Sequence, residues 1–517
     1  MTEAFATMLD WDGGLALLPP IVAVLLAWFT RRVIGSLLVA ALVAAAVATK
    51  GDPLTTPTLL LETIWGNVTD PDNATITAFS VAVAATVGVL GRSGGTRALV
   101  AQVERVATNR RRSMVASWLA GALVFFDDYA NCLVVGSSMG PLCDRHGVSR
   151  AKLAYIVDAT AAPIASVALV STWIGYEVGL LAKELEAVGS DVAPFGLFLE
   201  ALPYRFYCLL TLAFVGAIAI SGRDFGAMRR HEAQARPVAA RGGTAQEDRP
   251  LWVGLLPVGT LVFGVFGILV GHGLFNLDFQ IAGKAPFEVL DAADPFLDMA
   301  LGASLALLVS LGTGRAVGVS FSEMGRAAWA GTKAVGAALV VLYLAWTLGS
   351  LIKQTEAAPF LASLLEGRLP PELLPLATFV LAGLTAFGTG SSYFTMGTLI
   401  PLVLPLALQI DPQGGPIVLA SMAAVLDGAV LGDHISPISD TTILSSIGAG
   451  VDLMVHVRTQ LPYALTVGAV AVAVCVLPAG YGVSPLLLVP VGMAVCISVV
   501  MLVGRSPDLT APAAARP

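Results

Sequence analysis

Long apolar segments recur along the whole chain, and they limit its possible folds more than any other feature. Leu15 to Phe29, Val33 to Thr49 and Leu251 to Gly271 each approach the roughly 20 residues that a helix needs to cross a membrane. With 56% hydrophobic residues, 13% charged residues and a mean hydropathy of +0.81, the chain is too apolar for a hydrated soluble surface. The sequence therefore predicts an all-α polytopic membrane protein.

Basic residues gather in alternate loops, which indicates the loops that face the cytoplasm. They lie at Arg31 and Arg32, at Arg110 to Arg112, from Arg145 to Lys152, and from Arg223 to Arg249. The intervening loops are acidic or nearly free of positive charge, as in Gly51 to Asn73. We therefore expect a multi-pass protein of the bacterial plasma (inner) membrane, with its N-terminus outside and its C-terminus in the cytoplasm.

The segment from Ser113 to Cys143 has basic residues on both flanks, although a single crossing would have them on one. A re-entrant hairpin that enters from the cytoplasm and turns near Phe126 to Tyr129 explains both flanks. Non-helical backbone at that depth is tolerated only where it is buried in protein or lines a cavity, so the hairpin tip is a candidate site. In the next span, Asp158 and Pro163 predict a helix interrupted near mid-membrane.

The second half repeats this order in the opposite orientation. Five transmembrane helices plus one hairpin give an odd number of crossings, so the two halves must be inverted, as in secondary transporters. Each repeat therefore contains about five transmembrane helices, one of them broken, and one re-entrant hairpin. The predicted organisation is a first inverted repeat at 1–221 (hairpin 113–143, broken helix 151–182), a cytoplasmic linker at 222–250, a second inverted repeat at 251–478 (hairpin 373–409, broken helix 415–449), and an extra C-terminal helix and tail at 479–517.

Four helix breaks are predicted, at 127–131, 161–163, 388–392 and 432–437, and carboxylates cluster in the first and the last. A carboxylate within the membrane is costly unless it is paired, solvated or protonated, and a hard cation such as sodium prefers oxygen ligands. An organic anion would favour Arg or Lys, but these breaks contain no basic residue except His434. A cation is therefore favoured as at least one transported species.

The candidate residues fall into three groups. The predicted sodium ligands are Asp433, Asp440, Ser436, Ser439, Thr441, Thr442, Asp127, Asp128 and Asn131. The predicted proton-coupling residues are Asp433, Asp440, His434, Asp127 and Asp158. The predicted lining of the substrate cavity is Thr389, Ser391, Ser392, Pro163, Ser166 and Asp427.

Structural roles compete with these functions. Asp427 could only bridge helices, His434 could be a satisfied buried histidine, and Asp158 could only bond the neighbouring hairpin. The serines and threonines could simply satisfy broken helix ends. Asp127 and Asp128 are adjacent, so their side chains diverge and we expect one of them to line the cavity.

Two of these motifs resemble a known family. "GDHISPISDTTILSS", Gly432 to Ser446, and "FFDDYAN", Phe125 to Asn131, are similar to motifs of the NhaC-type Na+/H+ antiporters of the wider ion transporter superfamily. The family usually has a cysteine where Ile435 stands and often a tryptophan near Tyr393. The resemblance implies an elevator-like movement of a hairpin-bearing domain against a scaffold, and relatives are also thought to exchange small organic acids such as malate and lactate.

The sequence thus predicts a sodium/proton antiporter that exchanges cytoplasmic Na+ for external H+ by alternating access. The alternative is a Na+- or H+-coupled transporter or antiporter of a small organic acid or amino acid, whose carboxylate would lie at helix N-termini. A channel or a membrane scaffold fits inverted repeats poorly. We expect no enzyme activity, no resident cofactor and no nucleic-acid partner. The lipid bilayer, Na+ and H+ are the expected partners, and a homodimer is one state that the chain could adopt.

Overall fold

In the computed structural model of the chain, the regular elements of the described residues are helices, apart from one isolated antiparallel bridge between Asp224 and Arg505. The described residues are 14–30, 32–105, 107–190, 192–235, 237, 249–277, 279, 293–355, 360 and 370–506. Among these, nine helices are long and apolar enough to span a membrane, or up to eleven if two bent pairs each form one span. The prediction of an all-α polytopic membrane protein is confirmed. Residues 1–13, residues 236 and 238–248 of the predicted linker, and residues 507–517 of the C-terminal tail fall outside the described residues.

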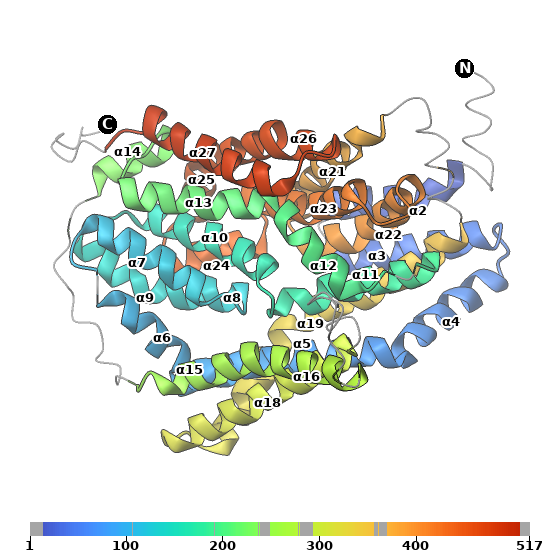
Figure 1. Cartoon of the computed structure of the whole chain (residues 1–517), viewed down its shortest axis with the longest axis horizontal. Coiled ribbons are helices and arrows are strands. Elements are labelled where there is room, and N and C mark those ends of the chain that lie inside the picture. Colours follow the sequence, from blue (N-terminus) through green and yellow to red (C-terminus); the bar gives the residue numbers. More distant parts are fainter. Residues whose placement is uncertain are drawn as a thin grey trace.

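The first half of the chain forms the helices coloured blue to green in Figure 1. They are η1 (Gly14–Leu17), α2 (Leu18–Thr30), α3 (Val33–Ala48), α4 (Thr55–Thr69), α5 (Pro71–Ser93), α6 (Gly95–Glu104), α7 (Arg110–Leu123), α8 (Asp128–Ala130), η2 (Asn131–Val135), α9 (Gly136–Arg145), α10 (Arg150–Val167), α11 (Thr172–Val188), α12 (Pro194–Ala201), η3 (Leu202–Tyr204), α13 (Phe206–Ser221) and α14 (Gly226–Gln234).

The second half forms the helices coloured from yellow-green to red (Figure 1). They are α15 (Trp252–Gly259), η4 (Thr260–Gly264), α16 (Val265–Asn276), α18 (Pro295–Ala316), α19 (Phe321–Gln354), η5 (Pro371–Leu373), α21 (Leu374–Thr389), α22 (Ser392–Ile410), α23 (Pro416–Ile435), α24 (Asp440–Ala449), α25 (Leu453–Val470), η6 (Ala471–Val476), α26 (Leu477–Gly480) and α27 (Pro485–Val503).

Two helical hairpins and two broken helices, one of each from either half of the chain, pack against one another. In the first hairpin, α7 runs to a turn at 124–127, and α8, η2 and α9 return. In the second, α21 and α22 meet at Gly390, whose φ of +67° ends α21. The second segment of each broken helix packs on the hairpin of the other half: α24 contacts η2 and α9, and α11 contacts α22. Residues from both halves are therefore brought together at the breaks.

The predicted position of one helix break is wrong. α10 continues through Pro163 and ends at Val167, and α11 begins at Thr172 after a bend of 46°. Ser171 determines this position, because its Oγ donates to the Ala165 carbonyl at 2.6 Å and accepts from Trp173 N at 3.2 Å. Pro163 removes one backbone donor but leaves the rest of the helix intact. In the second half the break is 436–439, so Gly432 to Ile435 are still helical.

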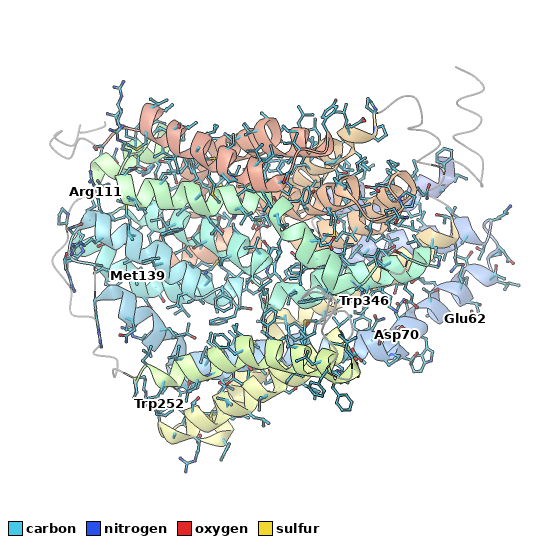
Figure 2. All side chains as sticks on the ribbon, in the orientation of Figure 1. Glu62, Asp70, Arg111, Met139, Trp252 and Trp346 are labelled. Atoms are coloured by element: carbon cyan, nitrogen blue, oxygen red, sulfur yellow. The ribbon has the colours of Figure 1, made fainter. Side chains whose placement is uncertain are left out.

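A second layer of helices lies below the hairpins in Figure 1, formed by α5, α15, α16 and α18, with α19 between it and the centre. α5 and α19 approach closely because Gly88 faces Ala327 and Gly331 faces Ala84. A Cβ atom on either glycine would lie only 2.2 or 2.1 Å from the carbonyl oxygen opposite. Figure 2 shows Trp252 at the edge of this layer and Trp346 in the interior, where its indole N–H donates to the Gly179 carbonyl at 3.2 Å.

Candidate functional site

The tip of the first hairpin meets the start of α24. The Tyr129 hydroxyl donates to the Asp440 carboxylate, and the Cys132 thiol donates to the Thr441 carbonyl at 3.7 Å. Ser445 Oγ donates to Cys132 Sγ at 3.1 Å, so the contact continues along the first turns of α24. The structure thus brings together the two acidic motifs that the sequence predicts to form one site.

Asp433 and Asp440 lie on either side of the break between α23 and α24. Asp433 is 1% exposed, and its Oδ2 accepts from Thr441 Oγ1 at 2.6 Å, while its Oδ1 has no hydrogen-bond partner. Asp440 accepts from the Thr441 backbone N–H at 2.9 Å. Ser439 caps α24 by accepting from Thr442 N at 3.3 Å. One buried carboxylate oxygen is therefore left to bind a cation or a proton.

The adjacent aspartates of the first hairpin have different environments. Asp127 caps α8, because its Oδ1 accepts from Ala130 N at 2.6 Å. Asp128 is 2% exposed and its Oδ2 has no partner. Asn131 donates to the Gly121 carbonyl at 2.7 Å, which closes the hairpin, while its Oδ1 is unpartnered. Asp128 and Asn131 therefore each have a side-chain oxygen that accepts no hydrogen bond, whereas the Asp127 carboxylate caps a helix.

Asp158 lies at the centre of a buried polar network. Its carboxylate accepts from Thr442 Oγ1 and Ser445 Oγ, both at 3.2 Å, and from Gln460 Nε2 at 2.5 Å. His456 Nε2 donates to it at 3.3 Å. These hydrogen bonds join α10 to α24 and α25, and none of them goes to the first hairpin.

His434 belongs to the same network. Gln460 donates to the His434 carbonyl at 2.8 Å, and the His434 ring shares a hydrogen bond between its Nδ1 and the Tyr207 hydroxyl at 2.9 Å. The other ring nitrogen, Nε2, is buried without a partner. Sequence reasoning missed His456 and Gln460. Their four-residue spacing in an apolar span, which puts both on one helix face, was the available signal.

Asp427 bridges helices. Arg205, at the kink between η3 and α13, donates to Asp427 Oδ1 at 3.1 Å, to Glu177 Oε2 at 3.2 Å and to the Ser166 carbonyl at 3.0 Å. Asp427 Oδ2 accepts from Tyr207 N at 2.5 Å. This network is the helix-bridging role that competes with a substrate role for Asp427. Sequence reasoning missed Arg205, although a lone arginine inside an apolar span requires such a partner.

An open cavity of about 540 Å³ adjoins the acidic site. Asp440 and Tyr129 form one wall, and the second hairpin tip forms another with Thr389, Gly390, Ser391 and Tyr393. The start of α3 and the middle of α19 complete it with Arg32, Val33, Ile34, Gly35, Ala337 and Val341. Thr389 and Ser391 of the predicted lining are among these residues.

Three other predicted residues donate their hydroxyl groups to backbone carbonyls. Ser392 Oγ donates to the Ala429 carbonyl at 3.3 Å, and Ser436 Oγ donates to the Phe387 carbonyl at 2.9 Å. Ser166 Oγ donates to the Pro163 carbonyl at 3.2 Å, within α10. Across the described residues, no group of three or more His, Cys, Asp or Glu side chains is arranged to hold a metal ion. A sodium site here would need hydroxyl and carbonyl oxygens beside the carboxylates.

Comparison with known proteins links this arrangement to ion transport. The model of the "Na+/H+ antiporter family" matches residues 164–480. An uncharacterized protein of Haemophilus influenzae (strain ATCC 51907 / DSM 11121 / KW20 / Rd) is 31% identical over 485 residues, which are 89% of this chain and 90% of that protein. The malate-2H+/Na+-lactate antiporter of Bacillus subtilis (strain 168) is 30% identical over 204 residues, 39% of this chain and 38% of that protein.

Two further proteins extend the comparison. The Na+/H+ antiporter NhaC of Alkalihalophilus pseudofirmus (strain ATCC BAA-2126 / JCM 17055 / OF4) is 29% identical over 159 residues, 30% of this chain and 33% of that protein. The crystal structure of the Alcanivorax borkumensis YdaH transporter superposes with a TM-score of 0.59 at 17% identity, covering 88% of this chain and 99% of that one. At such low identity the superposition shows a shared fold.

Proposed function

Because the chain belongs to the Na+/H+ antiporter family, it is a secondary transporter and not an enzyme, and we propose that it exchanges cytoplasmic Na+ for external H+. Family membership confirms the resemblance to NhaC-type antiporters. We place the protein in the bacterial inner membrane, with the linker at 222–250 in the cytoplasm, because the basic loops favour that orientation.

The proposal rests on one observation, the clustering of three carboxylates, those of Asp128, Asp433 and Asp440. All three lie at the meeting point of the first hairpin and α24, and two of them have a buried oxygen without a partner. No ion pair found among the described residues involves any of the three. A buried charge without a counter-charge costs several kcal/mol, so these groups favour a bound cation or a proton. Sodium and protons would then compete for the same oxygens, which is the basis of exchange.

We assign four sodium ligands. They are the carboxylates of Asp433 and Asp128, the second of which comes from the first hairpin, and the hydroxyl groups of Ser439 and Thr441. Their oxygens are of the type that hard cations prefer. The unpartnered Asn131 Oδ1 at the hairpin tip adds a neutral acceptor. We assign proton coupling to the same carboxylates and to His434 and Asp158. Gln460 donates to Asp158 and to the His434 backbone carbonyl, and Thr442 Oγ1 lies 3.2 Å from the Asp158 carboxylate and 3.4 Å from the Asp433 backbone carbonyl, so Asp158 is held close to both residues.

We propose two inverted repeats at 1–221 and 251–478 and an elevator-like movement. The crossed packing of α24 on η2 and α9, and of α11 on α22, supports a pseudo-twofold relation between the halves. The hairpins and broken helices would move together, while α3, α5, α18 and α19 would form the scaffold. The open cavity lies between these two sets of helices, since Asp440 and Ser391 face Arg32 and Ala337 across it.

The cavity also favours a second candidate, the transport of a small organic acid. Its volume of about 540 Å³ far exceeds what a bare sodium ion requires, and Arg32 lines it opposite the N-terminus of α22. A guanidinium and a helix N-terminus together suit a carboxylate substrate. The name of the Bacillus subtilis relative, a malate-2H+/Na+-lactate antiporter, is consistent with this class of substrate.

Purified protein in proteoliposomes distinguishes the two candidates. With a pH-sensitive dye inside, a sodium gradient alone should drive proton movement in the parent, and this movement should be ten- to hundredfold slower in the Asp433→Asn variant. Proton movement that requires added malate, lactate or an amino acid would support the second candidate. If neither a sodium gradient nor an organic-acid panel produced movement between about pH 6 and 9, where histidine and shifted carboxylates titrate, both candidates would be wrong.

A further inference from the structure

A basic pocket lies between α14 and the C-terminal end of α27, outside the site described above. Its volume is about 550 Å³, and Arg229 and Arg230 of α14 line it together with Arg505, which follows α27. Phe225 and Val503 add apolar walls. Figure 1 shows α14 and α27 side by side at the upper edge, and Figure 2 places Arg111 at the same end of the molecule. This pocket combines three positive charges with apolar surface.

The pocket has a fixed framework. Asp224 and Arg505 exchange two backbone N–H···O hydrogen bonds of 3.0 Å, and Arg223 donates to the Met501 carbonyl. These bonds hold the end of α27 against the start of α14. Asp224 also lines the pocket, but it pairs with the buried Lys152 and accepts from the Tyr463 hydroxyl at 2.7 Å. The charge of Asp224, the one acidic residue of the lining, is therefore balanced by Lys152 in the protein interior.

The three arginines have no carboxylate partner among the residues that the structure describes. The nearest acidic residue along α14, Glu232, pairs with Arg110 of α7 and accepts from Ser149 N at 2.8 Å. Its charge is thus directed away from Arg229 and Arg230 and into the protein. Arg230 and Arg505 are exposed and Arg229 is partly buried. The pocket therefore keeps a net positive charge that an external anion can balance.

Apolar surface continues from the pocket along α27. Leu502 is 84% exposed and Val503 is 57% exposed, and only Gly504 separates them from Arg505. Such a change from exposed apolar side chains to arginine is typical of the boundary between the hydrocarbon core and the headgroup region. An anion with attached hydrocarbon chains fits this arrangement better than a small soluble anion, which would leave the apolar side chains uncovered.

We propose that this pocket binds the phosphate of an anionic phospholipid, with the acyl chains along the Leu502 side of α27. A guanidinium group binds phosphate oxygens through a pair of parallel hydrogen bonds. The pocket has three guanidinium groups, those of Arg229, Arg230 and Arg505. A basic residue near an anionic membrane surface contributes about a fivefold preference. Phosphatidylglycerol should therefore be retained in preference to the zwitterionic phosphatidylcholine.

Three proteins test the proposal in nanodiscs that contain equal amounts of phosphatidylglycerol and phosphatidylcholine. They are the parent, the pocket variant Arg229→Gln/Arg230→Gln, and the control variant Arg145→Gln/Arg326→Gln, which removes two exposed arginines elsewhere. After mild extraction, native mass spectrometry counts the lipids that remain bound. The parent and the control should retain phosphatidylglycerol over phosphatidylcholine by roughly tenfold or more, and the pocket variant should lose at least about fivefold of that preference.

Three results would overturn the proposal. Equal retention of both lipids by the parent would exclude a selective site. An equal loss in the pocket and control variants would indicate diffuse surface attraction. Protection of the parent against thermal unfolding by soluble glycerol phosphate, to the same extent as by phosphatidylglycerol, would indicate a free-phosphate site. If the pocket variant does not fold, Arg230→Gln and Arg230→Lys replace it, and the second, which keeps the charge but not the paired hydrogen bonds, should lose less of the preference than the first.

Discussion

Asp433 has one carboxylate oxygen bound to Thr441 and the other buried without a partner. Asp433→Asn keeps the shape and the acceptor for Thr441 but removes the charge that sodium or a proton would balance. A contact with a charged group is worth roughly 1.5–3 kcal/mol, so we expect a ten- to hundredfold fall in sodium-driven proton flux. Thermal unfolding should change little.

The matched control for this variant is Asp298→Asn. Asp298 is also buried, at 2% exposed, but it bonds the His272 ring at 2.9 Å on α16 and lies in the proposed scaffold. Its substitution should leave transport at the parental rate. Parental flux in Asp433→Asn, measured in the same proteoliposomes, would remove Asp433 from the ion site.

Gln460 satisfies two buried acceptors at once, Asp158 and the His434 carbonyl. Gln460→Leu leaves the His434 carbonyl without this donor and weakens the surroundings of Asp158, which should cost about 1–3 kcal/mol of stability. Gln102→Leu is the control, because the two hydrogen bonds of Gln102, to the Ala98 carbonyl and from the Arg105 guanidinium, are both 3.4 Å long and at the surface. Its loss should cost below about 0.5 kcal/mol. Thermal unfolding in detergent compares them, and equal midpoints would contradict the role of Gln460.

At the scale of single residues, the acidic motifs could be predicted because carboxylates in apolar segments are rare and costly. Their partners could not. Arg205 donates a hydrogen bond to Asp427, which is 222 residues further along the chain, and Asp158 accepts one from Gln460, which is 302 residues away. No local pattern identifies a contact of that kind, so the sequence could not separate the helix-bridging Asp427 from the residues near the cavity.

At the scale of elements, α24 packs on the first hairpin through glycine. A Cβ atom on Gly448 would lie 2.2 Å from the Cys132 carbonyl oxygen, so Gly448→Ala forces the two backbones apart. We expect a loss of about 1–3 kcal/mol and reduced transport, because this contact aligns the two acidic motifs. Gly325→Ala on α19 is the control, since its Cβ would meet nothing within 4 Å. A Gly448→Ala protein as stable and active as the control would show that the contact is not required.

Asp70 caps α5 and holds Lys183 of α11 at 2.5 Å, at a corner that Figure 2 labels. Partial burial raises the pKa of Asp70, but the hydrogen bonds from Lys183 and the α5 amides outweigh burial and hold the pKa below its usual value. A lowered folded-state pKa means that the charge stabilises the fold above the unfolded pKa and that this stabilisation disappears as the pH falls through the folded pKa.

Asp70→Asn keeps a capping side chain but removes this charge, so it isolates the electrostatic part. We expect it to lower stability by less than about 1 kcal/mol at pH 7, because the pair is partly exposed. The difference from the parent should begin to shrink below the ordinary pKa of 3.8 and vanish only below the lowered folded-state pKa. Glu62→Gln on α4 is the control for loss of one acidic charge. Thermal unfolding at pH 7, 5 and 3 measures the effect, and a difference as large at pH 3 as at pH 7 would contradict its origin in ionised Asp70.

The hairpins could be predicted from their flanking charges, because basic residues on both sides of an apolar pair require an even number of crossings. The exact break between α10 and α11 could not. It depends on Ser171 and on the hydrogen bond of 3.0 Å from Thr172 N to the Phe126 carbonyl, which comes from the hairpin tip. Pro163 gave the stronger local signal but is accommodated inside α10.

At the scale of the whole molecule, hydropathy predicts the number of spans but not which spans form a scaffold. In a membrane, an apolar helix face can contact lipid or protein without a difference in composition. Close glycine contacts show where helices touch: Gly397 of α22 faces Ala345 of α19, with a Cβ separation of 2.7 Å, and Gly428 of α23 faces Ala382 of α21, with a Cβ separation of 2.8 Å. The first pair joins a hairpin to the proposed scaffold, and the second lies within the proposed moving part.

These two pairs test the elevator-like movement directly. In a background without the five buried native cysteines, Gly397→Cys/Ala345→Cys should form a disulfide that stops transport, and a reducing agent should restore it. Gly428→Cys/Ala382→Cys should crosslink without loss of transport, because α21 and α23 would move as one body. Both Cβ separations are shorter than the roughly 3.8 Å found in disulfides, so the two helices of each pair must move apart by about 1 Å. The two crosslinks therefore require a similar distortion of the structure. Undiminished transport with a complete Gly397–Ala345 crosslink would show that α22 and α19 stay together, and the assignment of α19 to the scaffold would then be wrong.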